Sequence, residues 1–181
     1  MKSKVRTLRP PRQPEQVRNR LIHAAISLLS EGLSVSIGSI ADAAGVSKGA
    51  VQHHFGTREH LFAAMSDAII EEFDKALAME DASIPAALRY ARLSLNEISP
   101  EDAAGRRAIL VASVVDRPIG SRWRERLKVE RALDTAPSAN ALLVRLAADG
   151  LWLSDLLSTY TISDKERKEI SVLMSELVKN S

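Results

Sequence analysis

Residues 36–61 read SIGSIADAAGVSKGAVQHHFGTREHL, and this stretch decides the fold of the 181-residue chain. Five of the eight glycines of the chain fall between residues 32 and 56, so the backbone must turn often here. The segments between these turns are too short to be stable as isolated helices. They must therefore pack together into one unit.

Two short helices joined by a glycine turn are predicted inside this stretch. Ser36 can cap a helix over residues 37–44 that Gly45 closes, and Ser47 can cap a second helix over residues 48–54. The inward-facing apolar positions are Ile40, Ala41, Ala44, Val51 and Phe55. The arrangement has the dimensions of a helix-turn-helix, whose second helix fits the major groove of B-DNA.

The second helix carries side chains suited to a nucleic acid. Lys48 lies in the first turn, where its cation can reach a phosphate, and Gln52 can pair with an adenine edge or with a phosphate oxygen. Gly49 costs about 1 kcal/mol of helix stability relative to alanine, which is understandable where the backbone must approach another surface closely. The remaining candidates, as a methyl-sized contact and as hydrogen-bond donors, are Ala50, His53 and His54.

The rest of the chain predicts an all-α protein of about nine helices, because no run of alternating β-branched residues lies between turn signals. A helix over residues 14–31 precedes the turn-rich stretch. Residues 1–13 are expected to form a basic flexible arm, residues 14–56 a three-helix DNA-binding domain, and residues 57–181 a ligand-binding and dimerisation domain. The later helices are expected from Thr57 through Leu77, after Ser83, after Ser99, over about 119–134, after Ser138, and after a capping box of Ser163 and Glu166.

Charge is distributed unevenly along the chain. The net charge is +2, but residues 1–60 hold nine Lys and Arg against four Asp and Glu, so they carry +5 and the remainder carries −3. A basic arm of this kind either adds phosphate or minor-groove contacts or is a solvated tail that touches nothing. The chain has no cysteine, no apolar run long enough to cross a bilayer and no apolar signal segment, so a cytoplasmic protein is expected.

The stretch from Ser36 to Leu61 resembles the N-terminal signature of the TetR family of transcriptional regulators. The resemblance extends back through the helix that ends before Gly32, and residues 146–153, LAADGLWL, resemble a phrase in one subgroup. It implies that the second short helix enters the major groove, that Ser36 and Lys48 contact phosphate, and that Thr57 and Arg58 clamp the DNA backbone. The predicted DNA-binding set is Ser36, Ser47, Lys48, Gly49, Ala50, Gln52, His53, His54, Thr57 and Arg58.

Three positions depart from the family pattern. Gln52 stands where a tyrosine is common, so it either reads a base or contacts the backbone. Gly38 stands where a basic or polar side chain is frequent. Ser39 replaces the usual acidic residue of the first short helix, which predicts a weaker cap.

The last two helices are apolar over more than one face, which favours burial on two sides. We expect a four-helix interface with a second subunit, as in the resembled family; the alternative is a wholly intramolecular core. The predicted interface residues are Leu146, Gly150, Leu153, Leu157, Ile170, Leu173, Met174 and Leu177.

The resemblance also implies a cavity for a small-molecule effector. The candidate lining residues are Met65, Ile69, Leu88, Leu110, Trp123 and Trp152. Each is more often ordinary core, because apolar residues at helical spacing need no ligand to explain them. The arginines around Trp123 would favour an anionic effector, or they form a solvated face.

The sequence therefore predicts a repressor that binds a palindromic operator as a dimer and is released by a small molecule. The alternative is a helical protein-interaction adaptor or a small-molecule carrier with no role at DNA. No cofactor, metal site or catalytic constellation is expected. His53 and His54 point about 100° apart on a helix and, with His60, lack a further nearby ligand type.

Overall fold

The computed structural model describes residues 14–95, 100–115, 117–134 and 139–179, and all regular structure within these ranges is α-helical. The described part therefore confirms the all-α prediction, although the predicted arm 1–13 and the expected caps Ser99 and Ser138 lie outside it. The helices are α1 (Pro14–Ser30), α2 (Ile37–Ala44), α3 (Lys48–Phe55), α4 (Arg58–Ala78), α5 (Ala86–Leu95), α6 (Pro100–Val115), α7 (Arg117–Arg131), α8 (Ala139–Leu157) and α9 (Asp164–Lys179).

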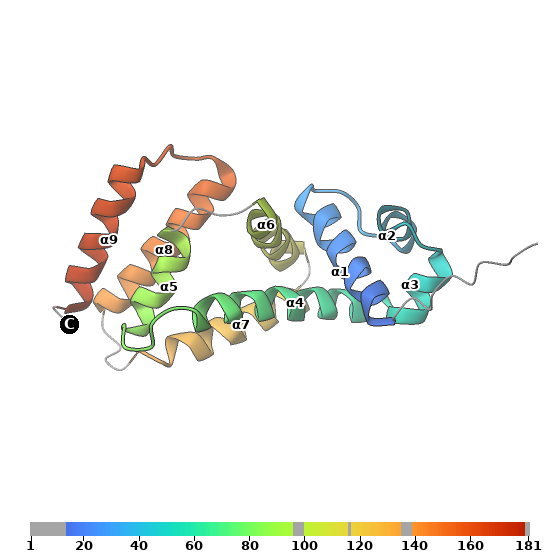
Figure 1. The fold of residues 1–181 in the computed structure, drawn as a ribbon, viewed down its shortest axis with the longest axis horizontal. Helices are drawn as coiled ribbons and strands as arrows, with labels where there is room; N and C mark the ends of the chain where they lie inside the picture. Colours follow the sequence, from blue (N-terminus) through green and yellow to red (C-terminus); the bar gives the residue numbers. More distant parts are fainter. Residues whose placement is uncertain (1–13, 96–99, 116, 135–138, 180–181) are drawn as a thin grey trace, which may run out of the picture.

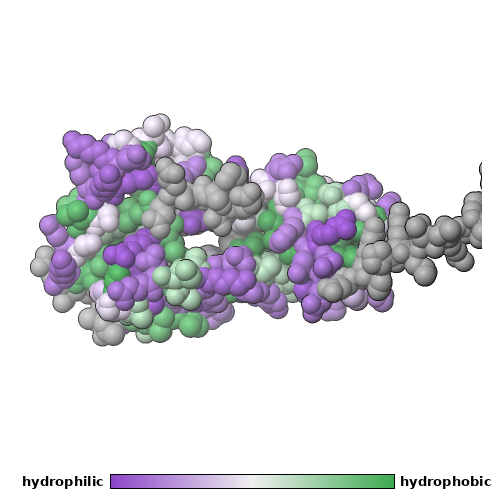
Figure 2. All heavy atoms as spheres, viewed as in Figure 1, coloured by the Kyte–Doolittle hydropathy of each residue, from purple (hydrophilic) through white to green (hydrophobic). Residues whose placement is uncertain are grey.

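The molecule is elongated, with one hydrophobic core towards each end (Figures 1 and 2). Helices α1, α2 and α3 form one end, and helices α5, α8 and α9 form the other. The long helix α4 runs along one side, with α7 packed beside it. Figure 2 shows an opening between the two ends of the molecule.

The first core is built on the stripe that the sequence predicts for α1. Its side chains meet α2 at Ile40 and α3 at Val51 and Phe55, and all of these are buried. The same core continues into the start of α4 and into α6 through Ala108 and Ala112. The predicted reading domain 14–56 therefore shares its core with two helices of the predicted regulatory domain.

The second core joins α5, α8 and α9 around small and aromatic side chains. Tyr90 of α5 donates a hydrogen bond to the Asp149 carboxylate of α8. Burial raises the pKa of the Tyr90 phenol far above its usual value, and the nearby Asp149 charge raises it further. Arg145 of α8 places its guanidinium 5.1 Å from the Tyr90 ring centre. These polar contacts add directional bonds to a largely apolar interface.

Helix α7 is tied to α4 by charge and by aromatic contact. Arg122 forms an ion pair with Asp67, and Arg126 forms one with Asp74 at 2.5 Å. The Trp123 ring meets the Phe73 ring edge-on, with centres 5.0 Å apart. The arginine-rich segment therefore contains two arginines that link helices, and it is more than a solvated charge run.

The helix ends largely follow their capping signals. Ser163 and Glu166 form the predicted capping box, with the Ser163 N–H donating to the Glu166 carboxylate at 2.8 Å. Ser39, which stands where the family usually has an acidic residue, still forms the reciprocal bond of α2, so the expectation of a weaker cap stays a prediction. The Ser36 N–H donates to the Ser39 hydroxyl at 2.9 Å, and the Ser39 N–H donates to the Ser36 hydroxyl at 3.1 Å. Helix α7 begins and ends two to three residues earlier than predicted.

A buried ion pair fixes the end of α7 against α8. Arg145 donates two hydrogen bonds to Asp134, at 2.9 and 2.8 Å, and a third to the Glu130 carbonyl at 3.2 Å. The exposed fractions of the Arg145 and Asp134 side chains are 8% and 6%. Each charge is therefore almost entirely removed from water.

We predict that Asp134→Ala lowers the free energy of unfolding by about 3–5 kcal/mol, because it leaves the Arg145 charge buried without a carboxylate. The measurement is urea unfolding followed by circular dichroism. The matched control is Glu125→Ala, which removes a salt bridge to Lys128 whose side chains are about 70% exposed and should cost less than about 1 kcal/mol. Equal losses in the two variants would contradict the prediction.

Candidate DNA-binding interface

Three helix starts carry hydroxyl caps at the end of the molecule that contains α2 and α3 (Figure 1). The hydroxyl of Ser36 caps α2, Ser47 caps α3 by accepting from the Ala50 N–H at 3.2 Å, and Thr57 caps α4 by accepting from the His60 N–H at 3.3 Å. Each cap fixes its helix start, where the remaining N–H groups and the helix dipole favour a negative charge.

Helix α3 separates a buried face from an exposed one. Val51 and Phe55 are 2% and 6% exposed and hold α3 on the first core. The opposite face presents Lys48, Gly49, Gln52 and His53 to solvent, whereas Ala50 and His54 are half-buried. Four of the six predicted contact residues of this helix are therefore exposed.

Lys48 lies over the first turn of α2. A Cβ atom built on Gly38 would be 3.5 Å from Lys48 Cε, 3.7 Å from Lys48 Nζ and 3.7 Å from Ser36 Oγ. The lysine and the cap hydroxyl therefore flank the same spot at the α2 N-terminus. The closeness of Lys48 to Gly38 is a relation that sequence reasoning missed because the two residues lie on different helices.

Two arginines of α1 support the reading helices. Arg20 donates a hydrogen bond to the Ala44 carbonyl at the C-terminus of α2, next to Gly45 in its left-handed conformation at φ +63°. The Arg18 guanidinium lies 5.5 Å from the Phe55 ring centre at the end of α3. Both arginines belong to the basic N-terminal part of the sequence. In the structure, however, their contacts link α1 to α2 and α3.

At the start of α4, Arg58 makes a contact within its own helix. Arg58 stacks on Phe62, with its guanidinium carbon 4.6 Å from the ring centre. The backbone N–H of Glu59 and the Thr57 hydroxyl hold the pKa of the Glu59 carboxyl below its usual value, and both contacts favour a negative charge at this helix start. The clamp by Thr57 and Arg58 stays a prediction.

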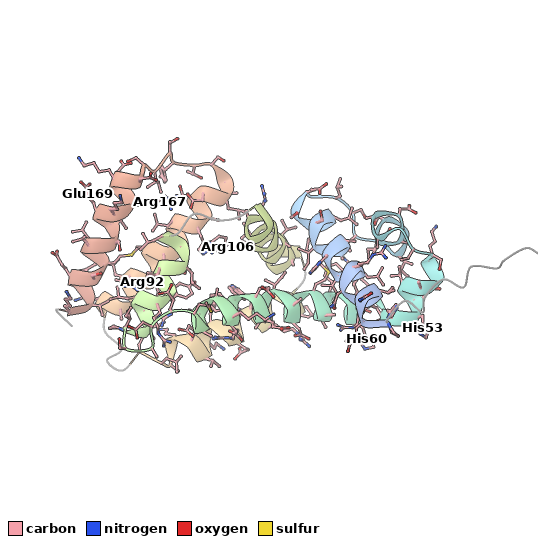
Figure 3. All side chains as sticks on the ribbon, viewed as in Figure 1. His53, His60, Arg92, Arg106, Arg167 and Glu169 are labelled. Atoms are coloured by element: carbon pink, nitrogen blue, oxygen red, sulfur yellow. The ribbon has the colours of Figure 1, made fainter. Side chains whose placement is uncertain are left out.

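The histidines do not gather with other metal-ligand types. In the described part of the chain, no group of three or more His, Cys, Asp or Glu side chains is placed to hold a metal ion. His53 and His60 lie at the end formed by α3 and the start of α4 (Figure 3). His60 places Nδ1 3.1 Å from the Phe55 carbonyl, a contact that links α4 to α3. Among the described helices, none is long and apolar enough to span a membrane.

The predicted interface face of α8 and α9 is exposed in part. Leu146, Leu157 and Leu173 are 56–59% exposed, and Gly150 also faces solvent. Leu153, Ile170 and Leu177 are half-buried. Met174 is a correction, since it is 3% exposed and belongs to the core of its own subunit. Two further exposed residues of this surface, missed from sequence, are Leu143 and Val172.

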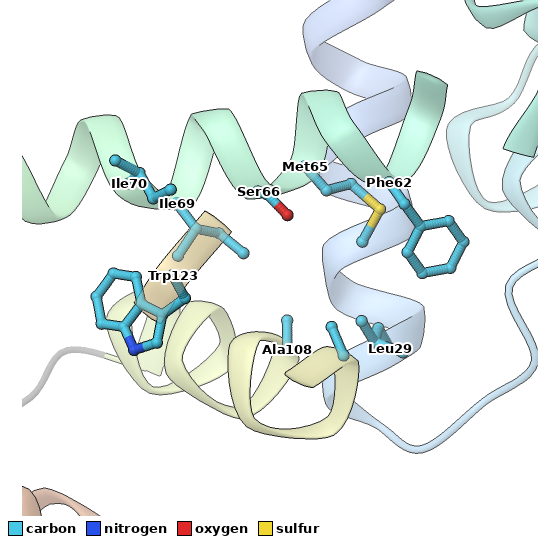
Figure 4. Close-up of a pocket in the computed structure, with 9 residues that line it drawn as sticks. Leu29, Phe62, Met65, Ser66, Ile69, Ile70, Ala108 and Trp123 are labelled. Atoms are coloured by element: carbon cyan, nitrogen blue, oxygen red, sulfur yellow. The ribbon is translucent and has the colours of Figure 1, made fainter. Parts of the chain in front are cut away.

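A small apolar cavity lies where α1, α4, α6 and α7 meet (Figure 4). Three of the six predicted effector residues, Met65, Ile69 and Trp123, line it. The other three do not. Leu88 packs against the second core, Leu110 is half-buried elsewhere on α6, and Trp152 donates a hydrogen bond from Nε1 to Asp149 at 3.4 Å.

The fold and this interface define a helix-turn-helix DNA-binding domain carried on a helical body. A family model described as bacterial regulatory proteins, tetR family, matches residues 21–65. A second, described as a tetracyclin repressor-like C-terminal domain, matches residues 85–179, which is more than half of the chain. The chain belongs to the TetR family of transcriptional regulators.

Solved structures share this fold at low sequence identity. A transcriptional regulator from Rhodococcus sp. Rha1 is 22% identical with a TM-score of 0.70, over 93% of this chain and 97% of that one. A member of the TetR family from Streptomyces coelicolor A3 is 23% identical with a TM-score of 0.69, over 88% and 98%. The multidrug binding protein EbrR, complexed with malachite green, is 24% identical with a TM-score of 0.66, over 93% and 98%. No curated protein matches the chain significantly.

We predict that Lys48→Ala weakens binding to all duplex sequences by a similar factor and reduces the slope of log affinity against log salt by about 1, because it removes one phosphate contact. Fluorescence anisotropy over a salt series measures both quantities. Lys75→Ala is the control, since Lys75 lies near the other end of α4 and pairs with Glu71 and Glu72. A loss confined to one sequence would reassign Lys48 to base reading.

Proposed function

We propose that this protein is a transcriptional repressor that binds a palindromic operator as a homodimer and is released from it by a small-molecule effector. The observation that carries the proposal is the pairing of an outward-facing α3 with Lys48 and Ser36 at the α2 N-terminus. A base-reading helix and an adjacent phosphate site are the two parts that a helix-turn-helix needs in order to hold its register on a duplex. The role at DNA requires no catalysis.

In this proposal α3 enters the major groove and Lys48 contacts a phosphate beside it. Gln52 and His53 are exposed on the same helix and supply hydrogen bonds to base edges or to the backbone. Gly49 allows the helix to approach the duplex closely. Ser36, Ser47 and Thr57 present helix N-termini whose N–H groups bind phosphate oxygens.

A single reading helix makes few base contacts, so a dimer that reads two half-sites gives the required specificity. The support for the dimer is the exposed leucine-rich surface of α8 and α9 together with Gly150. Gly150 lies in the middle of α8, where glycine destabilises a helix by about 1 kcal/mol relative to alanine. A Cβ atom at this position would meet nothing within 4 Å in its own subunit. Close approach by a partner helix accounts for a glycine there.

Release follows from the position of α4 in this proposal. The helix begins beside α3 and ends beside α5, so a ligand that moves α4 or α6 moves the reading helix with it. A change in the distance between the two α3 helices of a dimer breaks the match to half-sites that lie about 34–36 Å apart. The multidrug binding protein EbrR, which is similar in fold, has also been solved in complex with ethidium, and this supports a small organic effector for the present chain.

We predict that selection from a random duplex library yields a palindromic site, and that Gln52→Ala changes the preference at one symmetric base position if Gln52 reads a base. Sequencing of the selected pools of both proteins measures this. His23→Ala is the control, because His23 is exposed on α1. A uniform loss in the Gln52 variant would assign this side chain to the backbone, and the absence of any selected duplex would favour the adaptor or carrier alternative.

We further predict that Gly150→Leu converts the dimer to monomer at micromolar concentration, because its side chain occupies the space that the partner helix needs. Sedimentation velocity measures the oligomeric state, and circular dichroism verifies that the subunit remains folded. Gly105→Leu in α6 is the matched control, since a Cβ atom there also meets nothing within 4 Å. A monomeric wild-type protein, or an unchanged dimer in Gly150→Leu, would rule out the proposed interface.

A further inference from the structure

A small cavity lies between α1, α4, α6 and α7, and the proposed contacts with DNA do not involve it (Figure 4). Its walls are apolar, and they include one residue from the DNA-binding domain, Leu29 of α1. The free space is about 10 Å³, roughly enough for one water molecule. The lining residues from the other helices are Phe62, Met65, Ser66, Ile69, Ile70, Ala108, Ala112 and Trp123.

One polar group interrupts this apolar wall. Ser66 is 5% exposed, and its hydroxyl has no hydrogen-bond partner in the structure. Figure 4 shows the hydroxyl oxygen pointing from α4 into the space that faces α1 and α6. A serine within a helix usually satisfies its hydroxyl on the carbonyl four residues earlier, which is that of Phe62, but this bond is absent. Because an unpaired buried hydroxyl is unfavourable, the geometry calls for a partner inside the cavity.

The residues that line the cavity also indicate whether a ligand of Ser66 is charged or neutral. None of the lining side chains is charged. Of the arginines near Trp123 in the sequence, Arg122 and Arg126 are paired with Asp67 and Asp74 of α4, and Arg124 is exposed and donates to the Ser121 hydroxyl. An ionised ligand would enter this cavity without a counter-charge, which is strongly unfavourable. The cavity therefore suits a neutral ligand, and the anionic effector considered from the sequence does not fit it.

Binding of a ring requires this cavity to enlarge, because its present space holds about one water molecule. Met65 has a flexible side chain that adapts to irregular spaces, and Ala108 and Ala112 present only methyl groups from α6. Trp123 is half-buried and forms the outer wall, edge-on to Phe73. Rotation of the indole and a small displacement of α6 would open room for one ring, and aromatic walls favour an aromatic ligand.

We propose that this cavity binds a small neutral aromatic molecule with one hydrogen-bonding group, that the Ser66 hydroxyl pairs with this group, and that binding separates α1 and α6 from α4. The regulatory step rests on the proposed function given above. It differs from a displacement of α4 alone, because Leu29 lines the cavity and the ligand acts directly on the DNA-binding domain. Separation of α1 from α4 changes the placement of α3 and releases the operator.

The test uses phenol as the probe and the full-length Trp152→Phe protein, in which Trp123 is the single tryptophan. We expect saturable quenching or shift of Trp123 fluorescence by phenol below about 10 mM, within the affinity range open to a ligand of this size. Ser66→Ala should weaken phenol binding by about threefold to tenfold and leave benzene binding unchanged, because only phenol uses the hydroxyl. Benzoate, which is charged at pH 7, should not bind.

Two further variants locate the site. Ala112→Leu should abolish binding of phenol and benzene by filling the cavity, and its melting temperature without ligand verifies that it folds. Ser154→Ala is the matched control, because Ser154 is also 5% exposed but belongs to α8 and accepts a hydrogen bond from the Tyr160 N–H. It should bind phenol like the parent protein. Absence of phenol binding, or equal binding by the Ser66 and Ser154 variants, would overturn the proposal.

The regulatory step is measured on the operator obtained by selection. Phenol should lower operator affinity at least fivefold in the parent protein and have a weaker effect, at equal concentration, in Ser66→Ala. If no duplex is bound at all, the proposed function fails while the fluorescence result still decides the ligand site. If the operator is bound and phenol binds without lowering operator affinity, the regulatory step is wrong and the proposed function stands.

Discussion

Burial of the first two turns of α4 against α1 and α6 is the contact on which the rest of the structure depends. Leu61, Phe62 and Met65 are at most 4% exposed, and they belong to the same core as α1, α3 and α6. The DNA-binding domain therefore has no core that is separate from the body. Packed interiors do not deform continuously, so a rearrangement of this contact moves the reading helix as a unit.

The charged contacts determine where such a rearrangement can occur. Ion pairs from Arg122 and Arg126 hold α7 to the middle of α4, and this part of α4 lies on the far side of the cavity from α1. Among its described residues, α6 contributes the buried Ala108 and Ala112 and the half-buried Val111 to the first core. Methyl contacts are individually weak and have no preferred direction.

The local features of the fold are predictable from the sequence, but the contacts between helices are not. Features of the DNA-binding interface and of the cavity that depend on these contacts are therefore not predictable either. Caps such as Ser47 and Ser163 act within three residues of themselves, and the outward face of α3 follows from the buried spacing of Val51 and Phe55. A hydrophobic stripe shows that a helix is buried but does not identify its neighbour, which is why Met174 is predicted at a subunit interface although it lies in the core of its own subunit. The position of Lys48 over Gly38 depends on the angle between two helices, which spacing does not contain. Ser66 escapes prediction because a serine within a helix is usually satisfied by its own backbone, and only its unpaired position in the structure distinguishes it.

The polar contacts of the two cores differ in a way that bears on regulation. The second core contains directed bonds between helices, from Tyr90 to Asp149, from Arg145 to Asp134 and from Arg167 to Asp155. Such bonds have a single good geometry, and breaking one leaves a poorly solvated charge or hydroxyl, so they favour one arrangement of the helices that they join. The cavity region has one buried hydroxyl without a partner and otherwise apolar walls. In the function proposed above, ligand binding beside α1 moves the reading helix against the frame that α5, α8 and α9 supply at the dimerisation end.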